Sequence, residues 1–356
     1  MPDLRIVDVL WVTADKGGSR HYRAELPAAL LERRGVSTFV GEQAGSAPNG
    51  LIYSLDGQWP VFGRTVILQR QGAERGAERI TRAREAGQQI WMDCDDLLTA
   101  VPADNHARAG AGQVGIGWWA RMLPAVDGVI CSTPEIAAGL AKHARRRVVL
   151  PNLFDPGDRW RPATVAGVER PVQTVGWVGN TVVHRENLRT ARGWLSDVLE
   201  RHELNFVWGG WLPELEEEDA LAELTGIDPG RLYARRGLPF EGYPELFRGI
   251  DVGIVPLADS RYARAKTALK GLEYAAAGIP FLHGRHPHYE QVFGTRWRCR
   301  HQGEWRAKMR LLVTDAEARA RCAAEQHEAM VHYCERSEMV WSRCKFLSSP
   351  RMAASA

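Results

Sequence analysis

The chain has 356 residues, of which 45% are hydrophobic and 25% charged, and its formal net charge is +3. This length predicts two folded domains, and so small a net charge does not favour a nucleic-acid or membrane-surface protein. No apolar stretch reaches the roughly 18 residues that a membrane span needs. The six cysteines form no CxxC pair, which predicts free thiols in a reducing, cytoplasmic compartment.

Short apolar runs alternate with helical patterns in the first part of the chain. Residues 5–12 (RIVDVLWV) come first and are predicted to be a strand, not a signal peptide. Stretches such as 22–35 and 134–147 are apolar at helical spacing. The further predicted strands of this part are 36–41, 65–69, 89–93, 128–132 and 147–152. Strands alternating with helices predict a doubly wound, parallel α/β sheet.

Residues 152–171 interrupt this alternation, because they are rich in proline, glycine and charge and are typical of a linker. The alternation then restarts, and residues 315–346 form a last helical stretch. The predicted strands of this second unit are 173–179, 204–210, 231–237, 251–257 and 279–284. We therefore expect an N-terminal domain (1–155), a C-terminal domain (156–330) and a C-terminal helix and tail (331–356) that packs back on the first domain.

Two glycines follow the first predicted strand, in DKGGSRHYR. Gly17 and Gly18 allow a tight turn that brings backbone N–H groups close to a ligand, although a plain β–α turn explains them equally well. The fingerprint GxGxxG is absent both here and at the loop GWVGN, which holds Gly179 and Asn180. A dinucleotide-dependent oxidoreductase is therefore disfavoured.

The stretch DCDD, residues 93–96, places acidic side chains at the end of a predicted strand. A DxD pattern suits a divalent metal, whereas Asp96, the first residue of DLL, also suits a cap at the start of a helix. A second group, HGRHPHYE, holds His283, His286 and His288, but its spacing fits no strong zinc template, and a loop over a ligand site is the favoured interpretation. The paired tryptophans 118–119 follow a glycine-rich stretch and are either core residues or exposed rings on a loop that stack on sugars.

Lys266, Lys270 and Glu273 are spaced at i, i+4 and i+7, which gathers side chains on one face of a helix. This helix would start at the carboxyl end of strand 251–257, where free N–H groups and the helix dipole favour a phosphate. The lysines would add full charges, and a carboxylate accepts hydrogen bonds from sugar hydroxyls. A diphosphate beside a ribose would satisfy all three side chains. The alternative is a solvated face with lysine–glutamate pairing.

Residues 251–282 (DVGIVPLADSRYARAKTALKGLEYAAAGIPFL) resemble the donor-site signature of retaining family-4 glycosyltransferases of the GT-B fold, as found in bacteria and phages. The matching features are a strand ending in PL, a lysine-bearing loop, the pattern LKxLEyxAxGxP and a buried strand. Residues 175–187 (VGWVGNTVVHREN) resemble the family's glycine loop. The stretches IWMDCDDLL, GVICSTPEIAAGL and VVLPNLFD resemble landmarks of its N-terminal domain.

The resemblance implies two Rossmann-like domains facing a cleft, with the donor on the C-terminal domain and the acceptor on the N-terminal domain. Glu273 would hold the ribose hydroxyls of the donor. Lys266 and Lys270 would lie near the diphosphate and act in catalysis by compensating the charge that develops as the nucleotide leaves. One departure from the family is Ala265, which stands where many relatives have a glutamate that supports the donor sugar.

Further roles follow from the same resemblance. The glycine loop with Gly17 and Gly18 would face the cleft. Gly179 and Asn180 would cover the donor phosphates, and Arg185 would add charge there, unless it is a surface arginine. Asp95 would contact the donor sugar or orient the acceptor hydroxyl.

The function that these features imply is transfer of a sugar, with retention, from a UDP-sugar or GDP-sugar. No metal and no further cofactor are expected. The acceptor is left open between a glycan, a protein such as a phage structural protein, and a modified nucleic-acid base. Stable membrane insertion is not expected, and the oligomeric state is not predicted. Two alternatives stay open: a nucleotide-sugar epimerase of the same fold, and a degenerate protein that only binds nucleotide-sugar or glycan.

Overall fold

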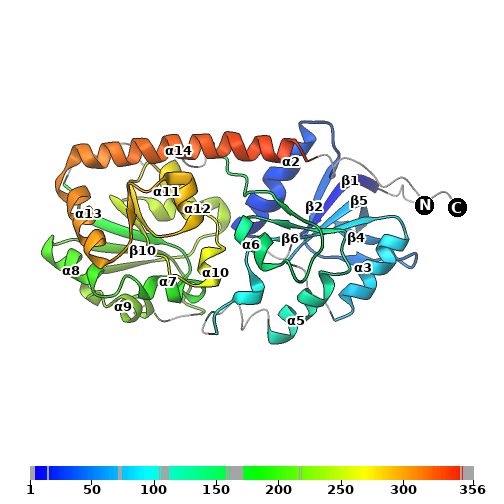
Figure 1. Cartoon of the computed structure of the whole chain (residues 1–356), viewed down its shortest axis with the longest axis horizontal. Helices are drawn as coiled ribbons and strands as arrows, with labels where there is room; N and C mark the ends of the chain where they lie inside the picture. The colour runs from blue at the N-terminus through cyan, green and yellow to red at the C-terminus, as the bar shows by residue number, and fades with distance from the viewer. Residues whose placement is uncertain are drawn as a thin grey trace.

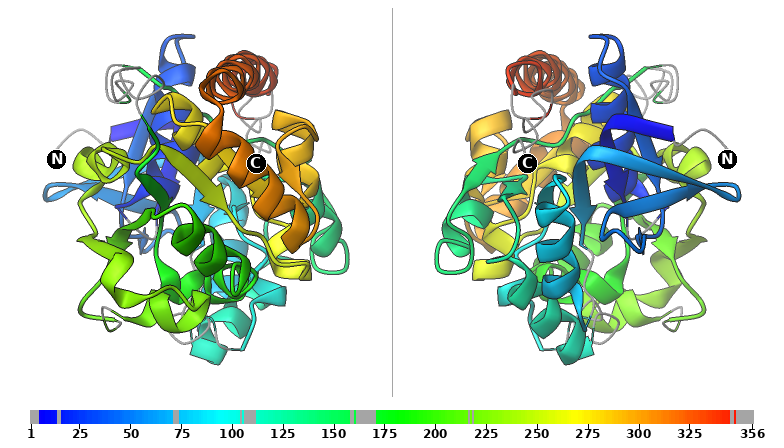
Figure 2. Two further views of the ribbon diagram at one scale, coloured as in Figure 1. Left: turned by 90° about the vertical axis from the view of Figure 1, so that its left-hand side faces the viewer. Right: turned by 90° about the vertical axis from the view of Figure 1, so that its right-hand side faces the viewer.

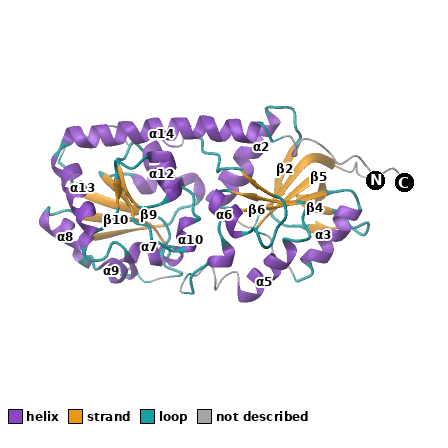
Figure 3. Ribbon diagram, viewed as in Figure 1, coloured by secondary structure: helices purple, strands orange, loops and turns teal. Residues whose placement is uncertain are grey.

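The apolar runs form two separate sheets in the computed structural model, which describes residues 5–13, 16–70, 74–103, 105, 112–157, 160, 171–215, 217, 219–344 and 347. Each sheet has helices packed around it, so that the molecule consists of two lobes (Figure 1). Figure 3 shows the strands at the centre of each lobe and the helices outside them. The doubly wound α/β architecture predicted from the sequence is confirmed.

The first sheet has the strand order β2-β1-β5-β6-β7-β8, and these strands pair in parallel. An antiparallel extension that the sequence did not predict, β3–β4, joins it through β5. All residues of β6 and β7 are buried, as expected for parallel strands covered on both faces. The strands are β1 (Arg5–Val12), β2 (Thr38–Gly41), β3 (Gly45–Ser46), β4 (Ile52–Asp56), β5 (Trp59–Gln69), β6 (Gln89–Cys94), β7 (Gly128–Cys131) and β8 (Arg147–Val149).

The second sheet is parallel throughout its described pairs, with the order β11-β10-β9-β12-β13-β14. The central strand β12 is fully buried. The strands are β9 (Thr174–Val178), β10 (Asn205–Trp211), β11 (Leu232–Arg236), β12 (Val252–Val255), β13 (Phe281–Gly284) and β14 (Arg298–Cys299). Five of the six follow predicted runs, and only the two-residue β14 was not predicted.

Helices connect the strands of both sheets. In the first lobe they are α1 (Gly18–Arg20), η1 (His21–Glu25), α2 (Leu26–Glu32), α3 (Gly76–Glu85), η2 (Leu98–Ala100), α5 (Gly112–Met122) and α6 (Pro134–Gly139). In the second lobe they are η5 (Thr181–Val183), α7 (Arg185–Arg189), α8 (Trp194–Arg201), α9 (Ala220–Thr225), η6 (Pro229–Arg231), η7 (Phe240–Phe247), α10 (Arg261–Arg264), α11 (Leu269–Ala276), α12 (Pro287–Phe293) and α13 (Gln302–Thr314). The helix α14 (Ala316–Ser342) completes the chain's described helices.

The long helix α14 links the two lobes and is seen nearly end-on in both views of Figure 2. Its first half packs on the second lobe, where the Gln326 amide forms two hydrogen bonds with the backbone of Phe281. Its second half reaches the first lobe, where the Trp341 indole donates a 2.7 Å hydrogen bond to the carbonyl of Pro151. The predicted packing of the C-terminal helix on the N-terminal domain is therefore confirmed. The predicted boundary between residues 330 and 331 falls inside this continuous helix.

The structure also bears on smaller expectations from the sequence. The six cysteines are free thiols, as predicted. Both tryptophans 118–119 lie on helix α5 and not on a loop, and Trp119 is a core residue, only 2% exposed, whereas Trp118 is half-buried. The predicted linker lies largely outside the described residues. Among the described helices, none is long and apolar enough to cross a membrane.

Candidate active site

A cavity of about 430 Å³ lies at the carboxyl ends of the strands, between the two lobes, and this volume is typical of small-molecule sites. The first lobe lines it with Gly17, Gly18, Ser19, Tyr22, Arg70, Asp95, Asp96 and Asn152. The second lobe lines it with Trp177, Val183, His184, Asn187, Leu238, Phe240, Tyr243, Val255, Pro256, Leu257, Tyr262, Lys266, Thr267, Leu269, Lys270, Glu273 and Tyr289. Six predicted site residues are therefore brought together: Gly17, Gly18, Asp95, Lys266, Lys270 and Glu273.

The three charged residues of the 266–273 stretch reach this cavity, but not from one helix face. Helix α11 begins at Leu269, so Lys266 precedes it on a short connection from α10. The reason is that the N–H of Ala268 is bonded to the His288 imidazole and does not continue the helical ladder. The predicted single helical face was wrong, while the convergence of the three side chains holds.

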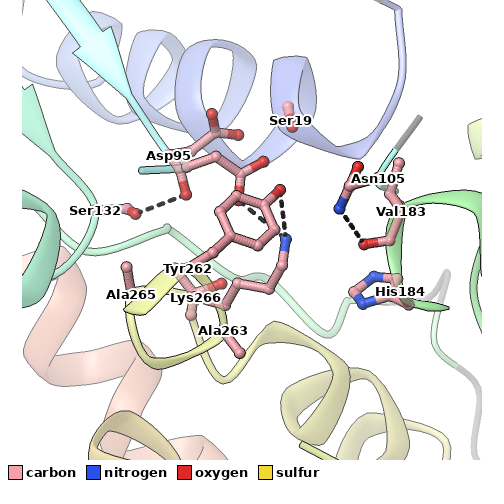
Figure 4. A network of polar contacts seen from close by, with 12 residues as sticks. Ser19, Asp95, Asn105, Ser132, Val183, His184, Tyr262, Ala263, Ala265 and Lys266 are labelled. Carbon is pink, nitrogen blue, oxygen red and sulfur yellow. Dashed lines mark hydrogen bonds and ion pairs between the residues drawn. The ribbon is translucent and has the colours of Figure 1, made fainter. Parts of the chain in front are cut away.

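Lys266 forms an ion pair across the cavity. Its Nζ lies 3.0 Å from a carboxylate oxygen of Asp96, in the opposite lobe. The same Nζ lies 3.3 Å from the Tyr262 hydroxyl (Figure 4). Burial by itself lowers the pKa of Lys266, but Asp96 and Tyr262 outweigh burial and hold that pKa above its usual value. Lys266 therefore keeps its charge over the physiological pH range.

Lys270 has a different environment. Its Nζ donates a 2.6 Å hydrogen bond to the carbonyl of Val178 and lies 5.2 Å from the centre of the Trp177 ring. Gly179 makes room for it, since a Cβ at this position would come within 2.4 Å of the Nζ atom. Burial lowers the pKa of Lys270 to about 8, with Glu273 opposing the shift. Among the described residues no carboxylate forms an ion pair with Lys270, which leaves its charge for a ligand.

Glu273 is 4% exposed and its carboxylate accepts hydrogen bonds from two tyrosines, Tyr22 at 3.4 Å and Tyr243 at 3.1 Å. Burial raises the pKa of Glu273 to about 7, although Lys270 and both hydroxyl donors oppose the shift. Each carboxylate oxygen still has a second lone pair for a ligand hydroxyl.

The glycine loop after β1 enters a helix that contains a π-helical turn, His21–Glu25. Turns of this kind are often found at functional sites because they re-aim side chains. Here Tyr22 points to the cavity, and the next residue, Arg23, turns to the buried Asp93. A Cβ at Gly18 would lie 3.3 Å from the Tyr22 ring and 3.6 Å from the Phe240 ring, so a larger residue would press on the Tyr22 ring.

Asp95 lines the cavity together with Arg70, a residue that the sequence analysis missed. Arg70 ion-pairs with Asp95 and donates a 2.6 Å hydrogen bond to the Ser19 hydroxyl. Burial by itself raises the pKa of Asp95, but Arg70 outweighs burial and holds that pKa well below its usual range. The φ of Arg70 is +49°, a left-handed conformation that is uncommon outside glycine and clusters at functional sites.

The DCDD stretch places every carboxylate beside a cation. Asp93 pairs with Arg23, Asp95 with Arg70, and Asp96 with Lys266. The carboxylate of Asp96 does not cap the short helix η2, for which no side-chain cap bond is found, so the capping interpretation was wrong. No group of three or more potential metal ligands is found in the described part of the chain.

Three predicted site residues, Gly179, Asn180 and Arg185, do not line the cavity. The Asn180 side chain accepts a hydrogen bond from the N–H of Val182 and caps the short helix η5. Arg185 starts helix α7. Their neighbour His184 does line the cavity, and burial, together with Lys270 and Lys266, holds its pKa well below its usual value.

Solved structures show which fold this arrangement belongs to. The sucrose-phosphate synthase of Thermosynechococcus elongatus aligns over 96% of this chain and 100% of its own, with a TM-score of 0.67 and 12% identity. An E. coli trehalose-6-phosphate structure bound with UDP-2-fluoro glucose aligns over 97% and 100%, with a TM-score of 0.62 and 12% identity. Anabaena HepE in complex with UDP and glucose aligns over 94% and 99%, with a TM-score of 0.58 and 12% identity.

The chain has the GT-B fold. This confirms the fold expected from the sequence. No protein-family model matches the sequence, and no curated protein matches it either.

The two GT-B lobes touch each other around the cavity. The Thr133 hydroxyl of the first lobe donates a 2.9 Å hydrogen bond to the carbonyl of Ala265 in the second. The Asn105 amide likewise donates a 2.9 Å hydrogen bond to the carbonyl of Val183 (Figure 4). Ala265 itself is 1% exposed and packs with the first lobe's core. A glutamate side chain at this position would have to be accommodated in that core, which accounts physically for the alanine.

Proposed function

We propose that this protein is a glycosyltransferase that moves a sugar from a nucleotide-diphosphate sugar to an acceptor hydroxyl, with retention. The observation that carries the proposal is the burial of Lys270 and Glu273 in one cavity, across which Lys266 forms an ion pair with Asp96 of the opposite lobe. Cations suit the diphosphate and the carboxylate suits the ribose hydroxyls. Six free thiols support a reducing, cytoplasmic setting.

The neighbours of the same fold support the donor class. One is bound with UDP-2-fluoro glucose and another holds UDP and glucose, so a UDP-sugar is the first donor to test, with GDP-sugars second. A structure of trehalose-6-phosphate synthase is described in terms of glycosyl transfer with retention, which supports the same stereochemical outcome here.

In the proposed reaction the bond from the anomeric carbon to the diphosphate oxygen breaks, a bond to the acceptor oxygen forms on the same face, and the proton of the acceptor hydroxyl passes to the departing diphosphate. Negative charge grows on the departing diphosphate, where Lys266 and Lys270 oppose it. The acceptor approaches from the first lobe, where Asp95 is held ionised by Arg70. Asp95 orients the acceptor hydroxyl by accepting its hydrogen bond.

The test that separates the alternatives is release of nucleoside diphosphate that depends on an acceptor. A transferase releases UDP or GDP in proportion to glycosylated acceptor. An epimerase would instead release the nucleotide or a rearranged sugar without an acceptor, and a binding protein would release neither.

Metal independence is part of the proposal, because each carboxylate of residues 93–96 is already paired with an arginine or lysine. We expect the rate of transfer to be unchanged in excess EDTA. Loss of activity with EDTA and its return with Mn²⁺ would contradict this assignment and make the DCDD stretch a metal site.

Replacing Glu273 with glutamine should weaken binding of the nucleotide. The variant keeps the size of the side chain but loses a charged acceptor, and hydrogen bonds to charged groups contribute roughly 1.5–3 kcal/mol, so affinity should fall about tenfold or more. Titration calorimetry with the nucleotide sugar measures this. Glu241→Gln, a change of an exposed glutamate in η7, is the matched control and should leave affinity unchanged.

Donor affinity should be greatest between about pH 7 and pH 8. Below pH 7 Glu273, whose pKa burial raises to about 7, becomes neutral and is a poorer acceptor for ribose hydroxyls. Above pH 8 Lys270, whose pKa burial lowers to about 8, loses the charge that binds diphosphate. The dissociation constant of a nucleotide sugar, measured from pH 6 to pH 9, should therefore rise below about pH 7 and above about pH 8. A constant value over this range would show that these two groups do not bind the donor.

A further inference from the structure

The backbone segment 263–268, which runs from the last residues of α10 to the start of α11, carries Lys266 into the cavity. The segment is not part of a continuous helical ladder, so its conformation depends on contacts with other elements. The N–H of Lys266 donates a 3.0 Å hydrogen bond to the carbonyl of Ala263. The position of Lys266 therefore depends on the position of this carbonyl.

His286 holds the beginning of this segment. Its Nε2 lies 2.7 Å from the same Ala263 carbonyl, and a carbonyl accepts only, so Nε2 carries the hydrogen. Its Nδ1 accepts a 3.2 Å hydrogen bond from the N–H of His288 and therefore carries none. The ring is 0% exposed, and both of its nitrogens are used by the backbone in the neutral form.

His288 holds the end of the segment. Its Nδ1 accepts a 2.9 Å hydrogen bond from the N–H of Ala268, the residue before α11. The ring is 6% exposed and lies near the Tyr333 ring of α14. Burial lowers the pKa of His288 to about 4 and also lowers the pKa of His286, so that both rings stay neutral and keep their acceptor nitrogens.

We propose that His286 and His288 are positioning residues that fix Lys266 in the cavity, an inference that rests on the proposed glycosyl transfer. They hold the segment at Ala263 and Ala268 from within the second lobe. Thr133 holds it between these points, at the carbonyl of Ala265, from the first lobe. This assigns the HGRHPHYE stretch a structural task in the reaction, in place of a zinc site or of a loop over the donor. Both ring nitrogens of His286 and the Nδ1 of His288 form hydrogen bonds with backbone groups.

A displacement of Lys266 should affect turnover more than donor binding. A charge that stabilises a transition state must be placed closely, and a displacement of about 1 Å can cost about 10²-fold in rate. Lys270 and Glu273 lie within α11 itself and do not depend on the segment in the same way. Loss of a histidine should therefore reduce kcat more than it weakens donor binding.

The experiment compares three variants of the whole protein. His288→Leu removes the acceptor, and kcat should fall by about 10²-fold with little change in donor affinity. His288→Asn places an amide oxygen near the former Nδ1 and should restore most of kcat. His283→Leu is the matched control, because His283 is equally buried but its Nδ1 bonds Gly284 and not the 263–268 segment. Its kcat should remain close to that of the wild type.

Amide hydrogen exchange of the peptide spanning residues 263–268 gives a readout that does not require the reaction. Exchange should be faster in His288→Leu than in the wild type, and slow in His288→Asn and His283→Leu. Unchanged exchange in His288→Leu would overturn the positioning role, whether or not transfer is found. Equal losses of kcat in His288→Leu and His283→Leu would overturn it too. Faster exchange in a protein that transfers no sugar would instead contradict the proposed function alone.

Discussion

Replacing Lys266 with methionine should slow glycosyl transfer by about 10²–10³-fold, the usual cost of removing one group that stabilises developing charge. Methionine keeps much of the volume of the lysine stem and loses the ammonium group that meets the leaving diphosphate. Binding of the nucleoside diphosphate should change much less, because Lys270 and Glu273 remain. Steady-state kinetics measures kcat, and calorimetry measures the binding separately.

The control for this substitution is Lys142→Met, which removes an exposed lysine of the first lobe outside the cavity and should leave kcat unchanged. Lys266→Arg keeps the charge and should recover part of the rate. If Lys266→Met retains the wild-type melting temperature and the wild-type rate, the salt bridge to Asp96 is only a contact between lobes, and Lys266 has no part in catalysis.

Replacing Arg23 with methionine should destabilise the first lobe by about 3–5 kcal/mol, because it leaves the carboxylate of Asp93 buried without its cation. Both side chains are 1% exposed. The guanidinium also donates a 2.6 Å hydrogen bond to the carbonyl of Leu150 and lies 5.5 Å from the Trp341 ring of α14. The variant therefore also weakens the attachment of α14 to this lobe.

Urea unfolding followed by tryptophan fluorescence measures the effect as a lower midpoint. The double variant Arg23→Met/Asp93→Leu removes both charges and should recover most of the lost stability, since replacing a whole buried pair by apolar groups is often neutral. If the free energy of unfolding of Arg23→Met lies within about 1 kcal/mol of the wild-type value, the loss is typical of a surface ion pair. That result would contradict the role of this buried pair.

The sequence predicts most of the sheet because buried parallel strands are continuous apolar runs. Residues 5–12 and 89–93 match β1 and β6 closely. The hairpin β4–β5 was missed because residues 45–56 contain proline, glycine and polar residues, and β4 becomes a strand only through antiparallel pairing with β5. The two-residue strands β3 and β14 carry no periodicity of their own.

The site was predictable where charged residues stand close together in the chain. Lys266, Lys270 and Glu273 were found in this way, but the break before α11 depends on His288, twenty residues later, and no local pattern reveals that contact. Arg70 was missed because a single arginine after a strand is commonly a surface residue. The role of Arg70 depends on its ion pair with Asp95, which follows the neighbouring strand β6.

The most direct test of the glycosyltransferase proposal is calorimetric titration of the wild-type protein with a panel of nucleotide-diphosphate sugars, with Glu273→Gln and Lys270→Met measured in parallel. We predict that one donor, with UDP-sugars as the first candidates, binds the wild type with one site per chain, and that both variants bind it about tenfold or more weakly. If no UDP-sugar or GDP-sugar binds, or if the donor binds both variants as tightly as the wild type, the cavity is not a donor site.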